Sequence, residues 1–232
     1  MNVAIKDNQV HVWQVNLKTV PADATKFTGT LSPDELERAG KLKFQRDREH
    51  FILSHSQLRL ILSKYCDCLP GELSFRYNSC KKPLISNTEF GELKFNMSHS
   101  DDLMLVGLCK RNEIGIDVEK VREVDELENI ANENFSAQEI KYLMDSSDKT
   151  NTFFKIWTRK EAFIKAIGKG IHFPLKSFCV ELKSQGSLEH LVILHHPSKP
   201  DQWRTSDLKV SDGYVASLAI NSDKFKISYF QL

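Results

Sequence analysis

The sequence lacks the features that mark secreted, membrane and zinc-binding proteins. Its 232 residues contain five cysteines, an odd number that indicates no disulfide framework, so we expect a reducing, cytoplasmic location. Cys66 and Cys68 are one residue apart and no second cysteine pair completes a zinc site. No apolar run of signal-peptide length opens the chain. Leu103–Leu108, among the longest apolar stretches, is far shorter than the ~20 residues that span a bilayer.

A large net charge is also missing. The chain has 32 Lys and Arg against 31 Asp and Glu, a formal net charge of +1. Proteins that bind nucleic acid usually carry a strongly basic face, so we expect no nucleic-acid partner. Disorder is not expected either, because 41% of the residues are hydrophobic and 9% are aromatic. The length fits one large domain or two small ones.

No Pro/Gly/Ser-rich linker divides the chain, yet the order of its predicted elements repeats. A capping box, in which a serine is followed three residues later by a glutamate, begins at Ser32 and again at Ser136. A long helix follows each box, over about 47–64 and 151–167. Short strands with alternating apolar residues follow each helix.

This repetition predicts an α+β fold of two similar subdomains in a pseudo-twofold arrangement, with the functional site between them. We place the boundary so that residues 1–112 form an N-terminal subdomain and residues 113–232 a C-terminal one. The similarity lies in the pattern of elements, and no residue-by-residue repeat is visible. A monomer is therefore sufficient to build one composite site.

Two acidic residues lie on one predicted strand in Gly115-Ile116-Asp117-Val118-Glu119. Side chains alternate between the faces of a strand, so Ile116 and Val118 should face a core while Asp117 and Glu119 share the other face. Carboxylates about 6–7 Å apart on one face can hold a hard cation. An Asp-x-Glu pair also arises by chance, and then it has no such role.

The long second helix contains a third acidic residue, Glu161, four residues before Lys165, so the two share a helix face. One interpretation is a solvated ion pair, and the other is a carboxylate and a cation beside a phosphate and a metal ion. The segment 155–176 has six Lys and Arg and one acidic residue, whereas 113–148 is acidic. This asymmetry suits an anionic substrate or an acidic partner.

The first half contributes Phe95-Asn96-Met97-Ser98-His99-Ser100. Ser98 and His99 are neighbours on a strand and point to opposite faces, so they do not form a nucleophile and its base. His99 is either structural or a donor to a phosphate oxygen. Basic residues also cluster here, either as a solvated face or as a polyphosphate site. They are Arg38, Lys41, Lys43, Arg46 and Arg48, with Lys81-Lys82-Pro83 further along.

The order of these segments is more specific than any one of them. Lys-Pro, then FNMSHS, then GIDVEK, then a helix reading WTRKEAFIKAIGKG resembles the 4′-phosphopantetheinyl transferase superfamily. The length resembles its two-half, surfactin-synthetase-activating type. The resemblance implies Mg²⁺-dependent transfer of the phosphopantetheine arm of coenzyme A to a serine of a carrier protein, with release of 3′,5′-ADP.

The resemblance also implies roles for individual residues. Asp117, Glu119 and Glu161 match the Mg²⁺ carboxylates, and Glu161 also matches a proposed general base. Lys165 matches a lysine that contacts the phosphates, so the catalytic set is Asp117, Glu161 and Lys165. The coenzyme A contacts are expected from Arg38, Lys82, Pro83, Ser98, His99 and Lys165. The family has glycine where this chain has Lys81, so the resemblance does not fix the backbone conformation of the loop around Lys81. It also does not assign roles to Arg46 and Arg48.

Two alternatives remain at this point. Asp117 with Glu181-Leu182-Lys183 imitates the acidic set of a metal-dependent nuclease, although the near-zero net charge disfavours it. A non-catalytic module that binds coenzyme A or a carrier protein is the other alternative. An acidic carrier is expected as partner, docking near the basic segment 155–176.

Overall fold

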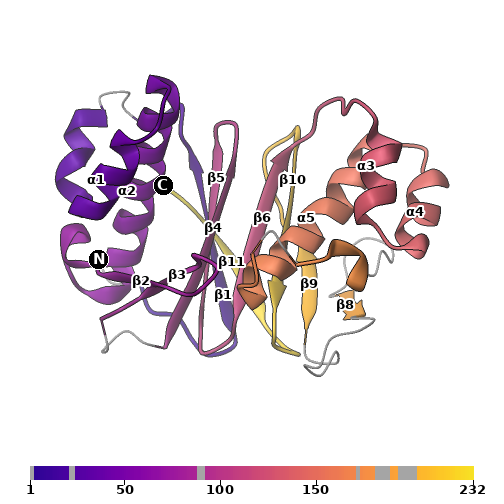
Figure 1. Cartoon of the computed structure of the whole chain (residues 1–232). Coiled ribbons are helices and arrows are strands. Elements are labelled where there is room, and N and C mark those ends of the chain that lie inside the picture. The colour runs from indigo at the N-terminus through magenta and orange to yellow at the C-terminus, as the bar shows by residue number, and fades with distance from the viewer. Residues whose placement is uncertain (1–2, 21–23, 88–91, 171–172, 181–188, 193–202) are drawn as a thin grey trace.

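The computed structural model in Figure 1 describes residues 3–20, 24–87, 92–170, 173–180, 189–192 and 203–232. The helices are α1 (Pro33–Gly40), α2 (Gln45–Cys66), α3 (Leu127–Asn134), α4 (Ala137–Met144) and α5 (Lys149–Ile167). The strands of the first half are β1 (Gln9–Asn16), β2 (Phe75–Tyr77), β3 (Pro83–Ile85), β4 (Leu93–Ser100) and β5 (Leu103–Lys110). Those of the second half are β6 (Ile114–Lys120), β7 (Cys179–Val180), β8 (Glu189–Val192), β9 (Arg204–Asp207), β10 (Tyr214–Ile220) and β11 (Lys226–Gln231).

Two sheets organise the described residues, which confirms the α+β class. The first has the order β11-β1-β5-β4 and the second β6-β10-β9-β8-β7, while β2 and β3 form a separate hairpin. All pairs are antiparallel except β1 with β11, which run parallel. The predicted boundary at residue 112 falls between β5 and β6, but β11 returns from the far end of the second half to the first sheet.

The sheets pack back to back with helices outside, α1 and α2 on one side and α3–α5 on the other (Figure 1). Alternate residues of each strand face opposite ways. Val10 and Val12 of β1 meet Ile116 and Leu218 in a core between the sheets. The intervening residues of the first sheet pack under α2, and those of the second pack under α5. Each sheet is thus covered on both faces.

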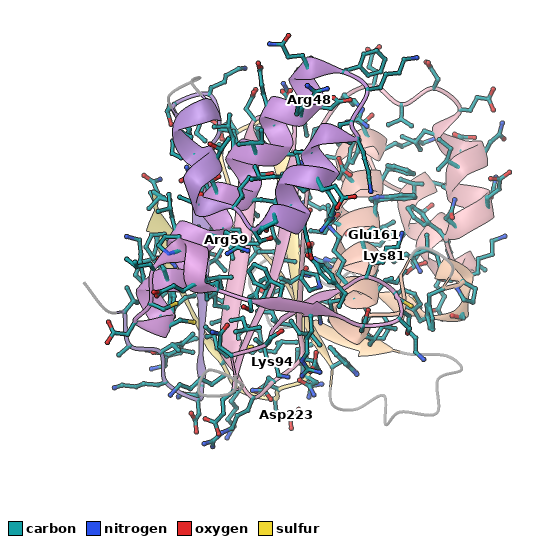
Figure 2. All side chains as sticks on the ribbon, turned by 60° about the vertical axis from the view of Figure 1, so that its left-hand side comes forward. Arg48, Arg59, Lys81, Lys94, Glu161 and Asp223 are labelled. Carbon is teal, nitrogen blue, oxygen red and sulfur yellow. The ribbon has the colours of Figure 1, made fainter. Side chains whose placement is uncertain are left out.

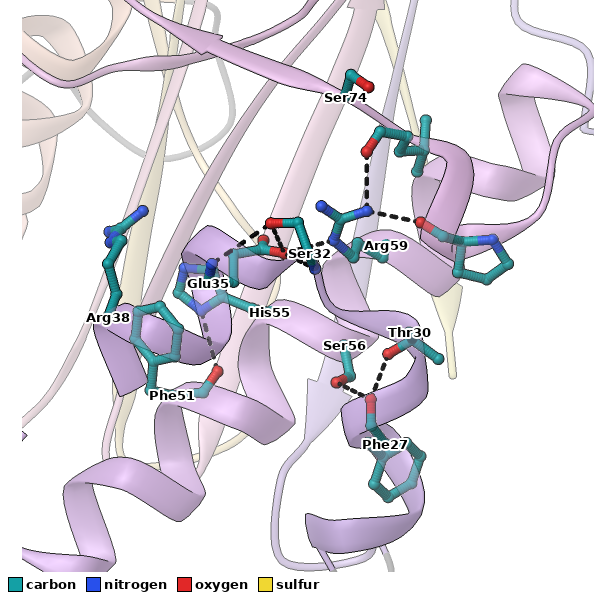
Figure 3. Close-up of polar contacts among 12 residues, drawn as sticks. Phe27, Thr30, Ser32, Glu35, Arg38, Phe51, His55, Ser56, Arg59 and Ser74 are labelled. Atoms are coloured by element: carbon teal, nitrogen blue, oxygen red, sulfur yellow. Dashed lines mark hydrogen bonds and ion pairs between the residues drawn. The ribbon is translucent and has the colours of Figure 1, made fainter. Parts of the chain in front are cut away.

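A buried ion pair recurs in the two halves. In the first, the capping-box residue Glu35 accepts from Nε of Arg59 at 2.7 Å, and Arg59 also donates to the carbonyls of Pro70 and Leu73 (Figure 3). Both side chains are at most 2% exposed. Burying the guanidinium this deeply is tolerable only because each of these contacts offsets desolvation.

The second half repeats the arrangement with a lysine. The capping-box residue Glu139 pairs with Lys160 at 2.8 Å, and Lys160 donates to the carbonyls of Leu175 and Phe178. Both side chains are fully buried. The duplication, visible in the sequence only as a pattern of elements, therefore extends to matched residues: Glu35 with Glu139, and Arg59 with Lys160.

No helix among the described residues is both long and apolar enough to cross a membrane.

Candidate active site

Strand β6 presents its acidic residues to helix α5. Ile114, Ile116 and Val118 are buried in the core between the sheets, so the odd-numbered residues face α5, as the alternation predicts. Gly115 lies where the helix comes closest: a Cβ there would be 2.0 Å from the carbonyl oxygen of Ala162. The backbone of α5 therefore lies directly against Gly115, and this contact brings the helix to Asp117.

Asp117 is buried and binds the ammonium of Lys165. Its Oδ1 accepts from Lys165 Nζ at 2.6 Å and from Ser98 Oγ at 2.9 Å, and Lys165 Nζ also donates to Ser98 Oγ at 2.9 Å. Burial raises the pKa of Asp117, while Lys165 and Ser98 oppose that rise. Three predicted site residues from β4, β6 and α5 therefore meet at one carboxylate oxygen.

A ladder of side chains from β4 completes the open edge of β6. Asn96, Ser98 and Ser100 accept hydrogen bonds from the backbone N–H groups of residues 116, 118 and 120 in turn. Each serine also donates to the preceding carboxylate, Ser98 to Asp117 and Ser100 to Glu119 at 2.9 Å. These bonds satisfy N–H groups that a neighbouring strand would otherwise bind. The two sheets are thereby joined where the acidic residues lie.

Glu161 extends from α5 into a cleft between the halves. Among the described residues it has no hydrogen-bond or ion-pair partner. Burial raises its pKa, and the negative charges of Asp117 and Glu119 raise it further while Lys165 lowers it. The cleft, of about 170 Å³, is also lined by Asn96 and Lys165. Figure 2 shows Glu161 and Lys81 together at this place.

The carboxylates have the chemistry of a divalent-cation site without its complete geometry. Oδ2 of Asp117 is buried and has no hydrogen-bond partner. Burial and the charge of Asp117 raise the pKa of Glu119, so the three carboxylates repel one another. A hard cation would relieve that repulsion through oxygen ligands. As placed, however, no three His, Cys, Asp or Glu side chains within the described residues form a metal-binding group.

His99 and Arg38, both predicted to contact coenzyme A, belong to the first half. The ring of His99 lies 4.7 Å from that of His50, centroid to centroid. Partial burial and the positive charges of His50 and Lys165 lower its pKa. Arg38 is exposed, donates to the hydroxyl of Tyr77 at 3.1 Å and stacks on that ring. Figure 3 shows Arg38 beside Phe51, whose ring it also overlies.

Lys82 does not present its ammonium to the cleft. Its Nζ donates to the carbonyl oxygens of Ala166 and Ile114 and to a carboxylate oxygen of Glu113. Lys82 and Pro83 both line the cleft. The ammonium of Lys82, which the sequence predicted to bind phosphate, instead has these three partners within the described residues. Lys81, where the family has glycine, adopts a φ of 65°, the left-handed conformation that glycine accepts most readily.

Other predicted residues lie apart from this cluster. Arg46 is 3.9 Å from Asp101, and Arg48 donates to the carbonyl of Leu42. Lys169 and Lys176 are exposed beyond α5. Glu181 and Lys183, which the nuclease alternative requires, lie outside the described residues.

Sequence reasoning missed Asn96, Ser100 and Asn78, which the structure places at the site or beside it. The signal for the first two was present: polar residues alternate at 96, 98 and 100, as the carboxylates do at 117 and 119. Two such alternations can face each other across neighbouring strands. Asn78 had no signal, since it lies in a turn whose partner is 90 residues away.

Both halves of the chain match models of known protein families. Residues 113–219 match the model of the 4′-phosphopantetheinyl transferase superfamily, and residues 17–110 match that of the 4′-phosphopantetheinyl transferase N-terminal region. The 4′-phosphopantetheinyl transferase HetI of Nostoc sp. is 33% identical over 94% of this chain and 90% of its own. The transferase Sfp of Bacillus subtilis is 30% identical over 70% and 71% of the two chains.

Among solved structures, the holo-[acyl-carrier-protein] synthase AcpS of Thermotoga maritima matches 48% of this chain and 64% of its own, with a TM-score of 0.38 at 22% identity. The two family models together cover most of both halves, and the HetI match covers 94% of the chain. The chain belongs to the 4′-phosphopantetheinyl transferase superfamily.

Proposed function

We propose that this protein transfers the 4′-phosphopantetheine moiety of coenzyme A to a serine of an apo-carrier protein and releases 3′,5′-ADP. Membership of the superfamily supports the reaction class. The observation that carries the assignment of the site is the meeting of Asp117, Ser98 and Lys165, contributed by both halves, beside the cleft that Glu161 lines.

The reaction needs an activated hydroxyl and a stabilised leaving group. The serine oxygen of the carrier attacks the phosphorus that bears the pantetheine arm, and the bond from that phosphorus to the ADP oxygen breaks. The serine proton passes to the carboxylate of Glu161 or to a water that it holds. In the metal-free protein a raised carboxyl pKa makes Glu161 a stronger base than an exposed glutamate. Coordination to a cation would lower that basicity, so the base role and the metal role proposed below compete, and the metal role is the better supported of the two. Lys165 neutralises negative charge on the departing ADP.

We further propose that Asp117, Glu119 and Glu161 hold a Mg²⁺ ion together with the diphosphate of the substrate. The ion, when bound, would neutralise charge on the diphosphate in the transition state. The unpartnered buried Oδ2 of Asp117 and the mutual repulsion of the carboxylates support this donor set. Oδ1 of Asp117 can keep its bond from Lys165, because it is the other oxygen, Oδ2, that has no partner.

For the carrier we propose an acidic surface that docks near Lys169 and Lys176, which are exposed beyond the end of α5. Opposite charges on the two partners would speed their encounter. Reversing both charges should weaken the apparent affinity for the carrier and leave coenzyme A binding unchanged. Unaltered carrier affinity would place the docking surface elsewhere.

The transfer itself is tested by mass spectrometry of an apo-carrier incubated with coenzyme A, Mg²⁺ and enzyme. Glu161→Gln and Asp117→Ala should stay folded, by circular dichroism, and lose nearly all transfer. Glu133→Gln and Asp212→Ala, which change exposed acidic residues elsewhere, are the matched controls and should transfer normally. Substantial transfer by either site variant would contradict the site assignment.

The same assay separates the alternatives. A non-catalytic binding module would bind coenzyme A and leave the carrier serine unmodified at every enzyme concentration. A nuclease would cut plasmid DNA in the presence of Mg²⁺ and leave the carrier mass unchanged.

A further inference from the structure

The loop between β2 and β3, residues 78–82, contacts the end of α5, the helix that bears Glu161 and Lys165. Lys82, at the end of this loop, donates from Nζ to the carbonyl of Ala166 at 2.8 Å and to that of Ile114 at 3.2 Å. It also pairs with Glu113 at 3.2 Å, and its side chain is 9% exposed. A single ammonium thus joins the last turn of α5 to the start of β6.

Asn78 makes a second contact with the same helix end. Its Nδ2 donates to the carbonyl of Gly168 at 3.0 Å, while its Oδ1 accepts from the backbone N–H groups of Cys80 and Lys82 at 2.9 Å. Gly168 ends α5 in a left-handed conformation with φ of 63°. A Cβ on Gly168 would lie 2.6 Å from Nδ2 of Asn78, so the two residues are in close contact.

These bonds satisfy carbonyl groups that the helix leaves open. The last four carbonyls of an α-helix have no partner within the helix. The carbonyl of Ala166, next in sequence to Lys165, belongs to this group and is bound by Lys82 from the other half. The end of α5 therefore has little freedom to move relative to β6 as long as the loop stays in place.

We propose that Asn78 and Lys82 are positioning residues: they clasp the end of α5 and so fix Lys165 and Glu161 opposite Asp117. The proposal rests on the transferase function above and assigns Lys82 a role different from the phosphate contact expected from the sequence. Within the described residues, the ammonium of Lys82 donates to the end of α5, to the first residue of β6 and to Glu113 just before it. None of these three acceptor residues is among the described residues that line the cleft.

Two variants test the clasp. Lys82→Met keeps the aliphatic stem and removes the ammonium. Asn78→Asp keeps the oxygen that organises the loop and removes only the donor to Gly168. The matched control is Lys94→Met, because Lys94 is the other partner of Glu113, at 3.5 Å, and has no contact with α5 among those described.

The first measurement is hydrogen–deuterium exchange of the free protein, without coenzyme A or carrier. Amides of residues 164–168 should exchange about tenfold faster in both clasp variants, because local opening governs their exchange. Lys94→Met should exchange as the parent does. This readout needs no transfer activity, so it tests the clasp even where the proposed reaction fails.

The second measurement is steady-state kinetics. A small displacement of catalytic groups costs up to about 100-fold in rate, so we expect kcat to fall about 10- to 100-fold while KM for coenzyme A changes less than about threefold. Unchanged exchange with a raised KM in Lys82→Met would make Lys82 a phosphate ligand and overturn the proposal. Equal effects in Lys94→Met would also overturn it.

Discussion

At the scale of single residues, the site is a place where the free protein carries unfavourable charge. Burial and mutual repulsion raise the pKa of Glu161. A carboxyl whose pKa is higher in the folded state binds more protons there than in the unfolded chain. Stability from this group is therefore present at low pH and is lost as the pH rises from the unfolded pKa of about 4.3 through the higher folded pKa.

This sign gives a prediction for Glu161→Gln, which removes the charge and keeps the shape. At pH 7.5 the free variant should melt above the parent, by about 2–4 °C for each kcal/mol of repulsion relieved. Near pH 4, where the glutamate is largely protonated in the folded parent, the difference should shrink. Calorimetry at both pH values measures it, with Glu133→Gln as control. A variant that melts lower at pH 7.5 would contradict the repulsion.

Some residues of the site were predictable and others were not, for physical reasons. Strand periodicity alone places Asp117 and Glu119 on one face, since neighbouring residues alternate. The binding partner of Lys82 was not predictable. The local sequence Lys-Pro is the same whether the lysine ammonium binds a phosphate or the carbonyl groups at a helix end. Local spacing contains no information about Ala166, 84 residues away.

At the scale of elements, the approach of α5 to β6 decides where Glu161 and Lys165, the proposed catalytic groups, lie relative to Asp117. Gly115 allows this approach, because a Cβ would be 2.0 Å from the Ala162 carbonyl oxygen and 2.4 Å from the Ala166 nitrogen. Both of those atoms belong to the helix backbone, which cannot relieve a steric clash by changing rotamer as a flexible side chain can. The helix as a whole would have to shift away from the strand.

We therefore predict that Gly115→Ala destabilises the protein by about 3 kcal/mol, the upper part of the usual range for overpacking. Transfer should fall even at temperatures where the variant is folded, because α5 bears Glu161 and Lys165. Chemical denaturation with a parallel transfer assay measures both. Gly40→Ala, where nothing lies within 4 Å of the new methyl group, is the control and should be neutral or slightly stabilising. A Gly115→Ala protein of normal stability would contradict the close contact.

Elements with a local signal were predicted well, and elements without one were missed. The two long helices, α2 and α5, have apolar periodicity, and α5 also begins at a side-chain cap from Asp148. Helix α3 was missed because its N-cap, Glu126, is in the left-handed region and makes no side-chain cap. Strand β9 reads Arg-Thr-Ser-Asp, with no apolar alternation, and is fixed by pairing with β10 and by Asp207 binding Arg159.

At the scale of the whole molecule, the duplication explains why the described chain forms one such site. Aligning Arg59 with Lys160 places Lys64 opposite Lys165 and Leu60 opposite Glu161, each by the same offset. Lys165 binds Asp117, whereas Lys64 lies over the ring of Trp13, 6.0 Å from its centroid. Where Lys165 meets the carboxylate of Asp117, Lys64 thus meets the aromatic ring of Trp13.

Strand β11 covers this corresponding position. Phe230 stacks on Trp13 with ring centroids 4.9 Å apart, and β11 pairs with the edge of β1. In the second half the matching edge, on β6, receives the polar ladder from β4. The edge of β6 therefore contributes residues to the site, whereas the edge of β1 is covered by β11.

We predict that Phe230→Asp loosens β11 and uncovers the edge of β1, because a carboxylate cannot replace the stacked ring. An exposed strand edge pairs readily with other chains. The variant should show concentration-dependent association by light scattering at temperatures where the parent does not. Gln231→Asp adds the same charge at an exposed position of the same strand and should behave as the parent. If Phe230→Asp and Gln231→Asp associate equally, the added charge and not the uncovered edge of β1 causes the association, and the prediction is wrong.

The pairing of β1 with β11 also sets an order of events during synthesis. Residue 226 leaves the ribosome 210 residues after residue 16, an interval of roughly 10 to 40 seconds at about 5–20 residues per second. Throughout that time the first sheet is missing one outer strand, and Trp13 has no aromatic cover. Assembly of the complete first sheet therefore waits until β11 has been translated.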